Sequence, residues 1–159
     1  MRIYKALILP IAIYGAESWT LRQADTRHIE SFEMRCLRVI LGVHLMDRVK
    51  NEEIRKRLNI PNTICEEVSK RRMKWFGHVV RMPHHRLPLQ AYKNDFTQRR
   101  PPGRPPTRWR DQIQGDLGVP LQEAEHQAQG RTEWRRMTRR RAKGHPVLYA
   151  LKSKVSQKT

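Results

Sequence analysis

The stretch DTRHIESFEMRCLRVILG, residues 25–42, decides the fold class of this chain. Its apolar side chains recur at helical spacing and form one face. They are Ile29, Phe32, Cys36, Leu37, Ile40 and Leu41. Asp25 is suited to cap the start of a helix, and Gly42 is suited to end it. The stretch therefore predicts an amphipathic helix that packs one side against a protein core.

An apolar run precedes this helix, in residues 2–16. The run is apolar on all sides and contains Pro10, which indicates a kinked helix or a strand–helix boundary packed against other protein. With Arg2 and Lys5 in front it has the outline of a signal peptide, but it is far shorter than the roughly 20 residues of a membrane helix. We therefore expect a buried helix, no membrane interaction, and a nuclear or cytoplasmic rather than a secreted protein.

Two more helices are expected downstream. Asn51 is placed to cap a short one, and Asn62 or Thr63 to cap a longer one that closes at Pro83. No part of the chain shows sustained alternation of apolar and polar residues, which is the pattern of a half-buried strand. The sequence therefore predicts an all-α protein.

Prolines indicate how the chain is divided. Residues 84–106 contain several prolines and arginines, which predicts an extended Pro/Arg-rich linker. The linker is expected to join a helical region, residues 1–83, to a small basic helical region, residues 107–143. A disordered tail is expected over residues 144–159. The predicted architecture is one or more small helical bundles joined by this linker.

Positive charge is concentrated in the second part of the chain. The 33 lysines and arginines exceed the 15 acids and give a formal net charge of +18. Residues 1–66 hold 11 basic and 8 acidic side chains, whereas residues 67–159 hold 22 and 7. A compact protein with such an excess repels itself, so the charge favours a polyanionic partner. Nucleic acid is the first candidate, and an anionic membrane surface is the second.

Three segments combine arginine with tryptophan, namely RRMKWFGHVVRMP (71–83), RRPPGRPPTRWRD (99–111) and RTEWRRMTRRRAK (131–143). Arginine binds phosphate through two hydrogen bonds, and tryptophan can stack on a base. The predicted contacts with RNA or DNA are Arg71, Arg72, Lys74, Arg81, Arg104, Arg108 and Arg110, with Trp75 and Trp109 as stacking platforms. For the tryptophans the favoured alternative is that each anchors a small helical core, because the apolar fraction of 38% is low.

The sequence shows no recognisable pattern of a catalytic site or a metal site. A polymerase holds magnesium with paired aspartates, and the acids of this chain are scattered. Cys65 and the histidines that follow it would supply only half of a Cys/His zinc site. We therefore expect no catalytic residue, no metal, no cofactor and no small-molecule substrate.

Two weaker motifs leave the mode of nucleic-acid binding open. GRPP, at Gly103–Pro106, is similar to the core of a minor-groove AT-hook, but Pro102 stands where that motif has its first arginine. Residues 51–75 can form two helices joined by a short turn, as in a helix-turn-helix.

Six blocks follow one another in the order found in one family of proteins. They are IYGAESWTL, FEMRCLRVILGV, DRVKNEEIRKRL, RRMKWFGHVVRMP, GRPPTRWRDQIQGDL and RTEWRRM. Over residues 2–138 the chain thus resembles the region downstream of the catalytic palm in reverse transcriptases of non-LTR (LINE-type) retrotransposons. The resemblance implies that Tyr14–Leu21 and Phe32–Val43 belong to or follow the thumb, which grips the template–primer duplex. It places residues 75–82 and 103–109 in a C-terminal extension that helps to hold element RNA or target DNA.

The fingers, the palm with its aspartates and the upstream endonuclease of that family have no counterpart in the chain. The expected function is therefore nucleic-acid binding by a C-terminal fragment of an RNA-directed DNA polymerase that is inactive alone. Two alternatives stay open. One is a stand-alone DNA-binding module of the helix-turn-helix type, and the other is a non-functional remnant of a transposable element.

Overall fold

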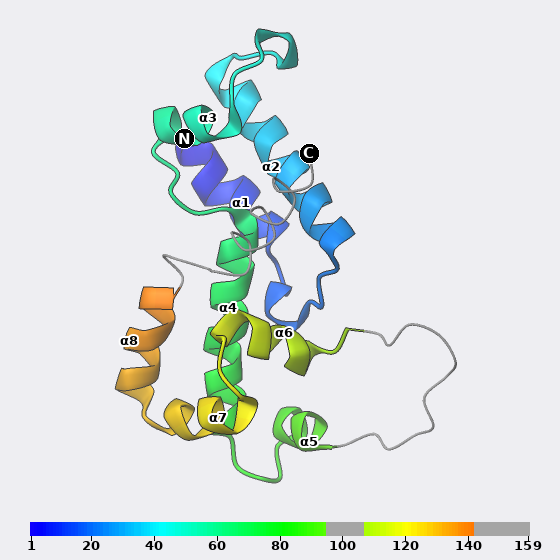
Figure 1. Ribbon diagram of the computed structural model, residues 1–159, viewed down its shortest axis with the longest axis vertical. Coiled ribbons are helices and arrows are strands. Elements are labelled where there is room, and N and C mark those ends of the chain that lie inside the picture. The colour runs from blue at the N-terminus through cyan, green and yellow to red at the C-terminus, as the bar shows by residue number, and fades with distance from the viewer. Residues whose placement is uncertain (95–106, 142–159) are drawn as a thin grey trace, which may run out of the picture. The chain divides into compact units, whose positions relative to one another are not determined.

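The computed structural model describes residues 1–94 and 107–141, and every regular element in these residues is a helix (Figure 1). This confirms the predicted all-α class. The chain forms two compact units, Met1–Ser69 and Lys70–Thr159, which divide within helix α4 (Ile64–Val80). The sequence instead placed its first boundary after residue 83.

The first unit begins with the predicted apolar helix. A π-helical turn, η1 (Tyr4–Ile8), continues into α1 (Leu9–Ala12), and a short 3-10 turn, η2 (Ala16–Ser18), follows. The wider π turn lies directly before Pro10, which has no N–H to donate and would crowd the carbonyl one α-turn back. The helical interpretation of residues 2–16 is therefore correct, and the strand alternative is not. The expected burial is only partial, because one side of the helix packs against the core. Tyr4 and Ile13 are buried, whereas Ile3, Leu7, Ile11 and Tyr14 are exposed.

Helix α2 (Gln23–Leu41) is the element expected from residues 25–42. Its end is as predicted, because Gly42 adopts a left-handed conformation with φ of 66°. Its start differs, since Asp25 is the third residue of the helix and accepts the Arg22 backbone N–H at 2.8 Å. A carboxylate at this position satisfies a backbone donor at the helix start, as an N-cap side chain would.

The buried face of α2 also differs from the predicted one. Met34 and Leu37 are buried, together with the charged Glu33. Phe32 and Ile40, which were expected on the buried face, are exposed. Glu33 faces inward because its hydrogen-bond partners lie in the interior of the unit. The buried side of α2 is therefore rotated away from the side that carries Phe32 and Ile40.

Two capped helices follow a 3-10 turn, η3 (Leu45–Asp47). In α3 (Asn51–Leu58) the predicted cap, Asn51, is the first helical residue and Lys50 occupies the cap position. At the start of α4, the Thr63 N–H donates to Glu66 and the Glu66 N–H donates to the Thr63 hydroxyl, both at 3.1 Å. This reciprocal pair is a capping box, and it confirms the expected start at Thr63.

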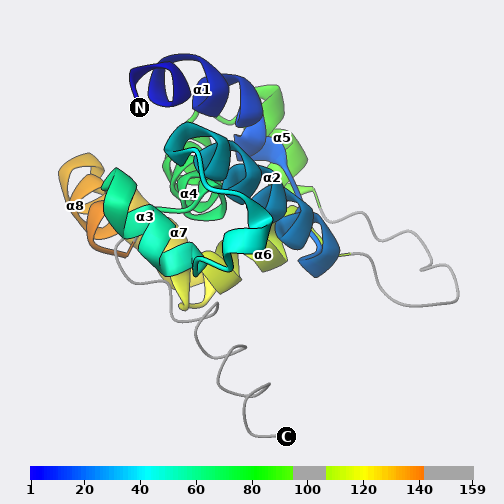
Figure 2. The same cartoon turned by 90° about the horizontal axis from the view of Figure 1, so that it is seen from above.

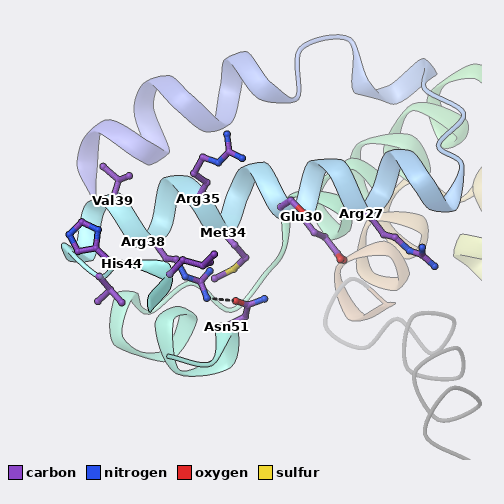
Figure 3. A pocket seen from close by; sticks show the side chains of 11 residues that line it. Arg27, Glu30, Met34, Arg35, Arg38, Val39, His44 and Asn51 are labelled. Carbon is purple, nitrogen blue, oxygen red and sulfur yellow. Dashed lines mark hydrogen bonds between the residues drawn. The ribbon is translucent and has the colours of Figure 1, made fainter. Parts of the chain in front are cut away.

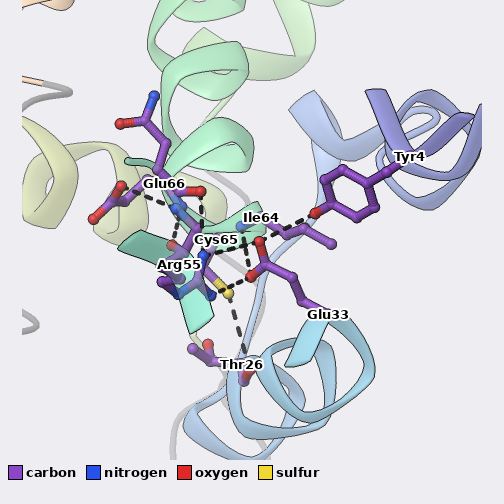
Figure 4. A network of polar contacts seen from close by, with 9 residues as sticks. Tyr4, Thr26, Glu33, Arg55, Ile64, Cys65 and Glu66 are labelled. Atoms are coloured by element: carbon purple, nitrogen blue, oxygen red, sulfur yellow. Dashed lines mark hydrogen bonds and ion pairs between the residues drawn. The ribbon is translucent and has the colours of Figure 1, made fainter. Parts of the chain in front are cut away.

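The Glu33 carboxylate joins four segments of the first unit (Figure 4). It accepts the Tyr4 hydroxyl at 3.1 Å, the Ile64 backbone N–H at 3.2 Å, and two bonds from Arg55 at 3.1 and 2.6 Å. Only 1% of Glu33 is exposed. Burial and the neighbouring Glu33 carboxylate raise the pKa of the Tyr4 hydroxyl. A buried carboxylate is stable here because donors satisfy both of its oxygens.

The second unit is built around an aromatic cluster. Its helices are the second part of α4, α5 (Leu87–Lys93), α6 (Trp109–Leu117), α7 (Leu121–Gln129) and α8 (Arg131–Arg141), which are labelled in Figure 2. Phe76 lies at the centre, with ring centroids 5.5 Å from Trp134, 5.7 Å from Tyr92 and 6.4 Å from Trp109. Aliphatic side chains from α4, α5, α6 and α7 complete this core.

Helix α5 is a correction to the predicted linker. Residues Leu87–Lys93 are helical, and Leu89 and Tyr92 are buried in the aromatic cluster. Pro88 does not prevent the helix because it lies in the first turn, where a missing N–H costs no intrahelical bond. The rest of the predicted linker from residue 95 on, and the predicted tail, lie outside the described residues.

Candidate nucleic-acid interface

Trp134 fixes helix α8 against helix α4. Its side chain is 3% exposed, and its indole N–H donates to the Met73 carbonyl at 3.1 Å. The indole occupies the space beside Gly77, where a Cβ atom would overlap it. Gly77 is therefore the residue that allows α8 to approach, and the favoured interpretation of Trp134 as a core anchor is consistent with this packing.

An exposed row of arginines runs along α8, outside the side that Trp134 buries. Arg131, Arg135 and Arg139 are all exposed and lie four residues apart. Residues at this spacing lie on one side of a helix, about 6 Å apart along its axis. The sequence predicted a basic helix here, but these three residues were not among its predicted contacts with nucleic acid. The reason is that the packing of Trp134 decides which side of α8 faces solvent, and this packing is not visible in the sequence.

Arg136, on the same helix, is engaged differently. It forms an ion pair with Glu133 at 2.7 Å, and both side chains are about 60% exposed. An exposed pair of this kind contributes roughly 0–1 kcal/mol to stability and is easily exchanged for another partner. This ion pair does not involve Arg131, Arg135 or Arg139, and all three of these side chains stay exposed.

A second group of basic side chains lies on the exposed side of α4. Arg71, Lys74 and His78 are exposed and follow one another at helical spacing. Arg71 and Lys74 were predicted contacts, and their exposure suits that role. Trp75 lies beside this group with its ring 5.4 Å from the imidazole of His78, and it is half-buried against the aromatic cluster.

The structure gives Arg72 a different role from the predicted one. Only 4% of its side chain is exposed, and it forms an ion pair with Asp116 at 2.7 Å. Asp116 is itself 11% exposed, so the pair is largely shielded from water. Arg72 therefore ties α4 to α6 and does not face an external phosphate strand.

Arg81 is also partly engaged within the fold. Its guanidinium donates to the Ala128 carbonyl at the end of α7. Burial and the nearby charge of Arg131 lower the pKa of Arg81.

The remaining predicted contacts lie at the start of α6. Arg108 occupies the N-cap position and is exposed, and its backbone N–H donates to Asp111 at 2.9 Å. Trp109 is half-buried, with its ring 6.2 Å from that of Tyr92. The guanidinium of Arg110 lies 4.7 Å from the centre of the Tyr92 ring. Arg104 lies outside the described residues.

Three further features bear on the chemistry of the described residues, namely their thiols, their potential metal ligands and the apolar character of their helices. Cys36 is half-buried and Cys65 is buried, and burial raises the pKa of the Cys65 thiol to about 12. A thiol with such a pKa stays protonated and is a poor nucleophile near neutral pH. Within residues 1–94 and 107–141 no three His, Cys, Asp or Glu side chains gather into a group that could hold a metal ion. In the same residues, none of the helices has the length and apolar character to cross a membrane.

Comparisons with known proteins give one informative similarity. No family model matches the chain, and no solved structure does. A transposon-derived protein of Caenorhabditis elegans is 24% identical over 121 residues, which cover 74% of this chain and 43% of that protein. The similarity is thus to a protein that derives from a transposable element. The chain spans less than half the length of this relative.

Proposed function

We propose that the second unit binds nucleic acid through its phosphate backbone. The observation that carries this proposal is the exposed row of Arg131, Arg135 and Arg139 on a helix held in register by Trp134. Arginine forms strong, paired hydrogen bonds with phosphate, and a regular row suits a regular polyanion. Arg71 and Lys74, on the exposed side of α4, add to the positive surface of the same unit.

The mode of binding is expected to depend on phosphates more than on bases. Proteins that hold single strands use aromatic side chains as stacking platforms. Here Trp134 is buried, and Trp75 and Trp109 pack against the aromatic cluster. With these rings committed to the core, we expect sequence-tolerant binding, with duplexes held at least as tightly as single strands.

The proposed origin is the region downstream of the palm of a non-LTR reverse transcriptase. The six blocks in family order support this origin, and so does the similarity to a transposon-derived protein. In this role the chain would hold element RNA or target DNA, and it would not polymerise by itself. An RNA-directed DNA polymerase assay on the isolated chain is therefore expected to give no product.

A matched pair of variants tests the proposed interface. In the first, Arg131, Arg135 and Arg139 are replaced by alanine. In the second, the exposed Lys50, Lys56 and Arg57 of the first unit are replaced, so that the net charge falls by the same amount. Fluorescence anisotropy with random-sequence duplex and single-stranded oligonucleotides is expected to show a loss of about tenfold or more for the first variant only.

Equal losses for the two variants would mean that binding follows net charge alone, and the proposed interface would be wrong. Absence of binding by the unaltered chain at low salt would contradict nucleic-acid binding altogether. A preferred site bound ~10³ times tighter than random duplex would instead favour the regulatory helix-turn-helix alternative.

A further inference from the structure

A groove of about 750 Å³ follows one side of helix α2 in the first unit (Figure 3). Its lining residues on α2 recur at helical spacing from Arg27 to Val39, and Val43, His44, Leu45 and Asn51 extend it. In Figure 3, Arg27 and His44 lie toward opposite ends of the group. The groove therefore runs along a helix and is elongated, which suits a chain-like ligand more than a compact small molecule.

Two guanidinium groups on this groove are without a partner among the residues that the structure describes. Arg27 and Arg35 are exposed, and among the described residues neither has a hydrogen bond or an ion pair. Arg38 is engaged within the fold, because its Nη2 donates to the Val49 carbonyl and to Asn51 Oδ1. The groove thus offers two cations, which are eight residues or about 12 Å of helix apart.

Four apolar side chains also line the groove, those of Met34, Val39, Val43 and Leu45. Met34 is buried beneath the groove, and Val39 and Leu45 are 76% and 77% exposed beside it. Large apolar side chains exposed together mark interaction sites more often than isolated ones do. Burial of these two side chains by a partner would contribute affinity that does not depend on charge.

We propose that this groove binds an acidic, amphipathic helix of another protein. Its apolar side chains would cover Val39 and Leu45, and carboxylates about two turns apart would pair with Arg27 and Arg35. Nucleic acid fits this groove less well, because a sugar–phosphate backbone has no apolar face to cover the exposed Val39 and Leu45 side chains. The proposal is independent of the nucleic-acid interface on the second unit.

The test uses the full chain and a labelled synthetic helical peptide with leucines at helical spacing between glutamates. A control peptide keeps every glutamate and replaces each leucine with serine. Arg35→Glu is compared with Arg57→Glu, which changes the net charge equally on the exposed side of α3. Val39→Ser combined with Leu45→Ser removes the apolar contacts at positions too exposed to affect folding, and circular dichroism checks that each variant folds.

We expect the leucine peptide to bind at least about tenfold more tightly than the serine peptide, as measured by fluorescence anisotropy. The double serine variant is expected to lose that advantage. Arg35→Glu is expected to weaken binding of the leucine peptide more than Arg57→Glu does, because Arg35 pairs with a glutamate of the peptide. The proposal is overturned if the leucine peptide does not bind, if Arg35→Glu and Arg57→Glu weaken it equally, or if duplex DNA displaces it by occupying the groove.

Discussion

The two units of this chain differ in what they expose to solvent. Of the eleven large hydrophobic side chains that are exposed among the described residues, ten belong to the first unit and only Leu87 belongs to the second. The second unit instead keeps its aromatic rings inside and exposes arginines on α8. Exposed apolar side chains suit a protein partner, and exposed arginines suit a polyanion. The comparison is the basis for the two proposals, protein contact for the first unit and nucleic-acid contact for the second.

The interiors differ as well. The first unit is held by a buried carboxylate, Glu33, which bonds to Tyr4, Arg55 and Ile64. The second is held by rings around Phe76 and by Trp134, which lies beside Gly77. Substitutions at these sites therefore test the comparison, because each should lower the stability of the unit whose interior it changes.

The largest expected effect is in the first unit. Glu33→Ala leaves the half-buried Arg55 charge and the Tyr4 hydroxyl without their acceptor, and we expect a loss of about 3–5 kcal/mol in the free energy of unfolding. Glu53→Ala removes an exposed partner of Arg57 and should cost less than about 0.5 kcal/mol. Urea denaturation followed by circular dichroism measures both, and similar values would contradict the proposed role of the buried network.

A comparable effect is expected from Arg72→Ala in the second unit. This change removes the ion pair between Arg72 and the largely buried Asp116, and the expected loss is about 3 kcal/mol. Lys74→Ala, on the exposed side of the same helix, should leave stability within about 0.5 kcal/mol and reduce affinity for duplex DNA. If Arg72→Ala instead lowered affinity and kept full stability, Arg72 would be a phosphate contact, as the sequence alone predicted.

Gly77→Ala is expected to have a smaller effect. The added methyl overlaps the Trp134 indole, and overpacking of this kind costs about 1–3 kcal/mol. Gly115→Ala is the control, because nothing lies within 4 Å of the new atom and alanine favours a helix by up to about 1 kcal/mol. Hydrogen exchange of peptides from α8 should accelerate only in the first variant. Equal exchange in both would show that Trp134 does not anchor α8.

The smallest effect at neutral pH concerns the thiols. The Cys65 pKa of about 12 lies above its unfolded value near 9, so the folded chain binds this proton more tightly than the unfolded chain does. This contribution to stability is complete below about pH 9 and is lost as the pH rises toward 12. At pH 8 a thiol reagent should label the half-buried Cys36 first and Cys65 only on unfolding. Labelling of both at one rate in folded protein would contradict the assigned burial.

Much of the helical pattern could be predicted because it depends on local chemistry. Gly42 ends α2 and Thr63 starts α4 as expected, since left-handed backbone and hydroxyl caps involve neighbouring residues. The caps assigned to Asp25 and Asn51 were off by one to three positions, because acids and amides are also favourable in the first turn. The concentration of charge beyond residue 66 was likewise visible in the sequence.

Long-range pairing could not be predicted. Arg72 and Lys74 look alike in the sequence, but Arg72 meets Asp116 across 44 positions and Lys74 faces solvent. The row on α8 becomes distinct from the other arginines only when Trp134 fixes which side of the helix is buried. Helix α5 was missed because proline composition outweighed the apolar pattern of Leu89 and Tyr92, which find their partners in distant helices.

The salt dependence of duplex binding tests the central claim most directly. Each phosphate contact lowers the slope of log K against log salt by about 0.9, so replacing Arg131, Arg135 and Arg139 with alanine should make the slope shallower by about 2–3. Replacing Lys50, Lys56 and Arg57 should leave the slope unchanged. The predicted result is a steep slope in the unaltered chain that becomes shallower only in the α8 variant. The same slope in all three proteins would contradict the account.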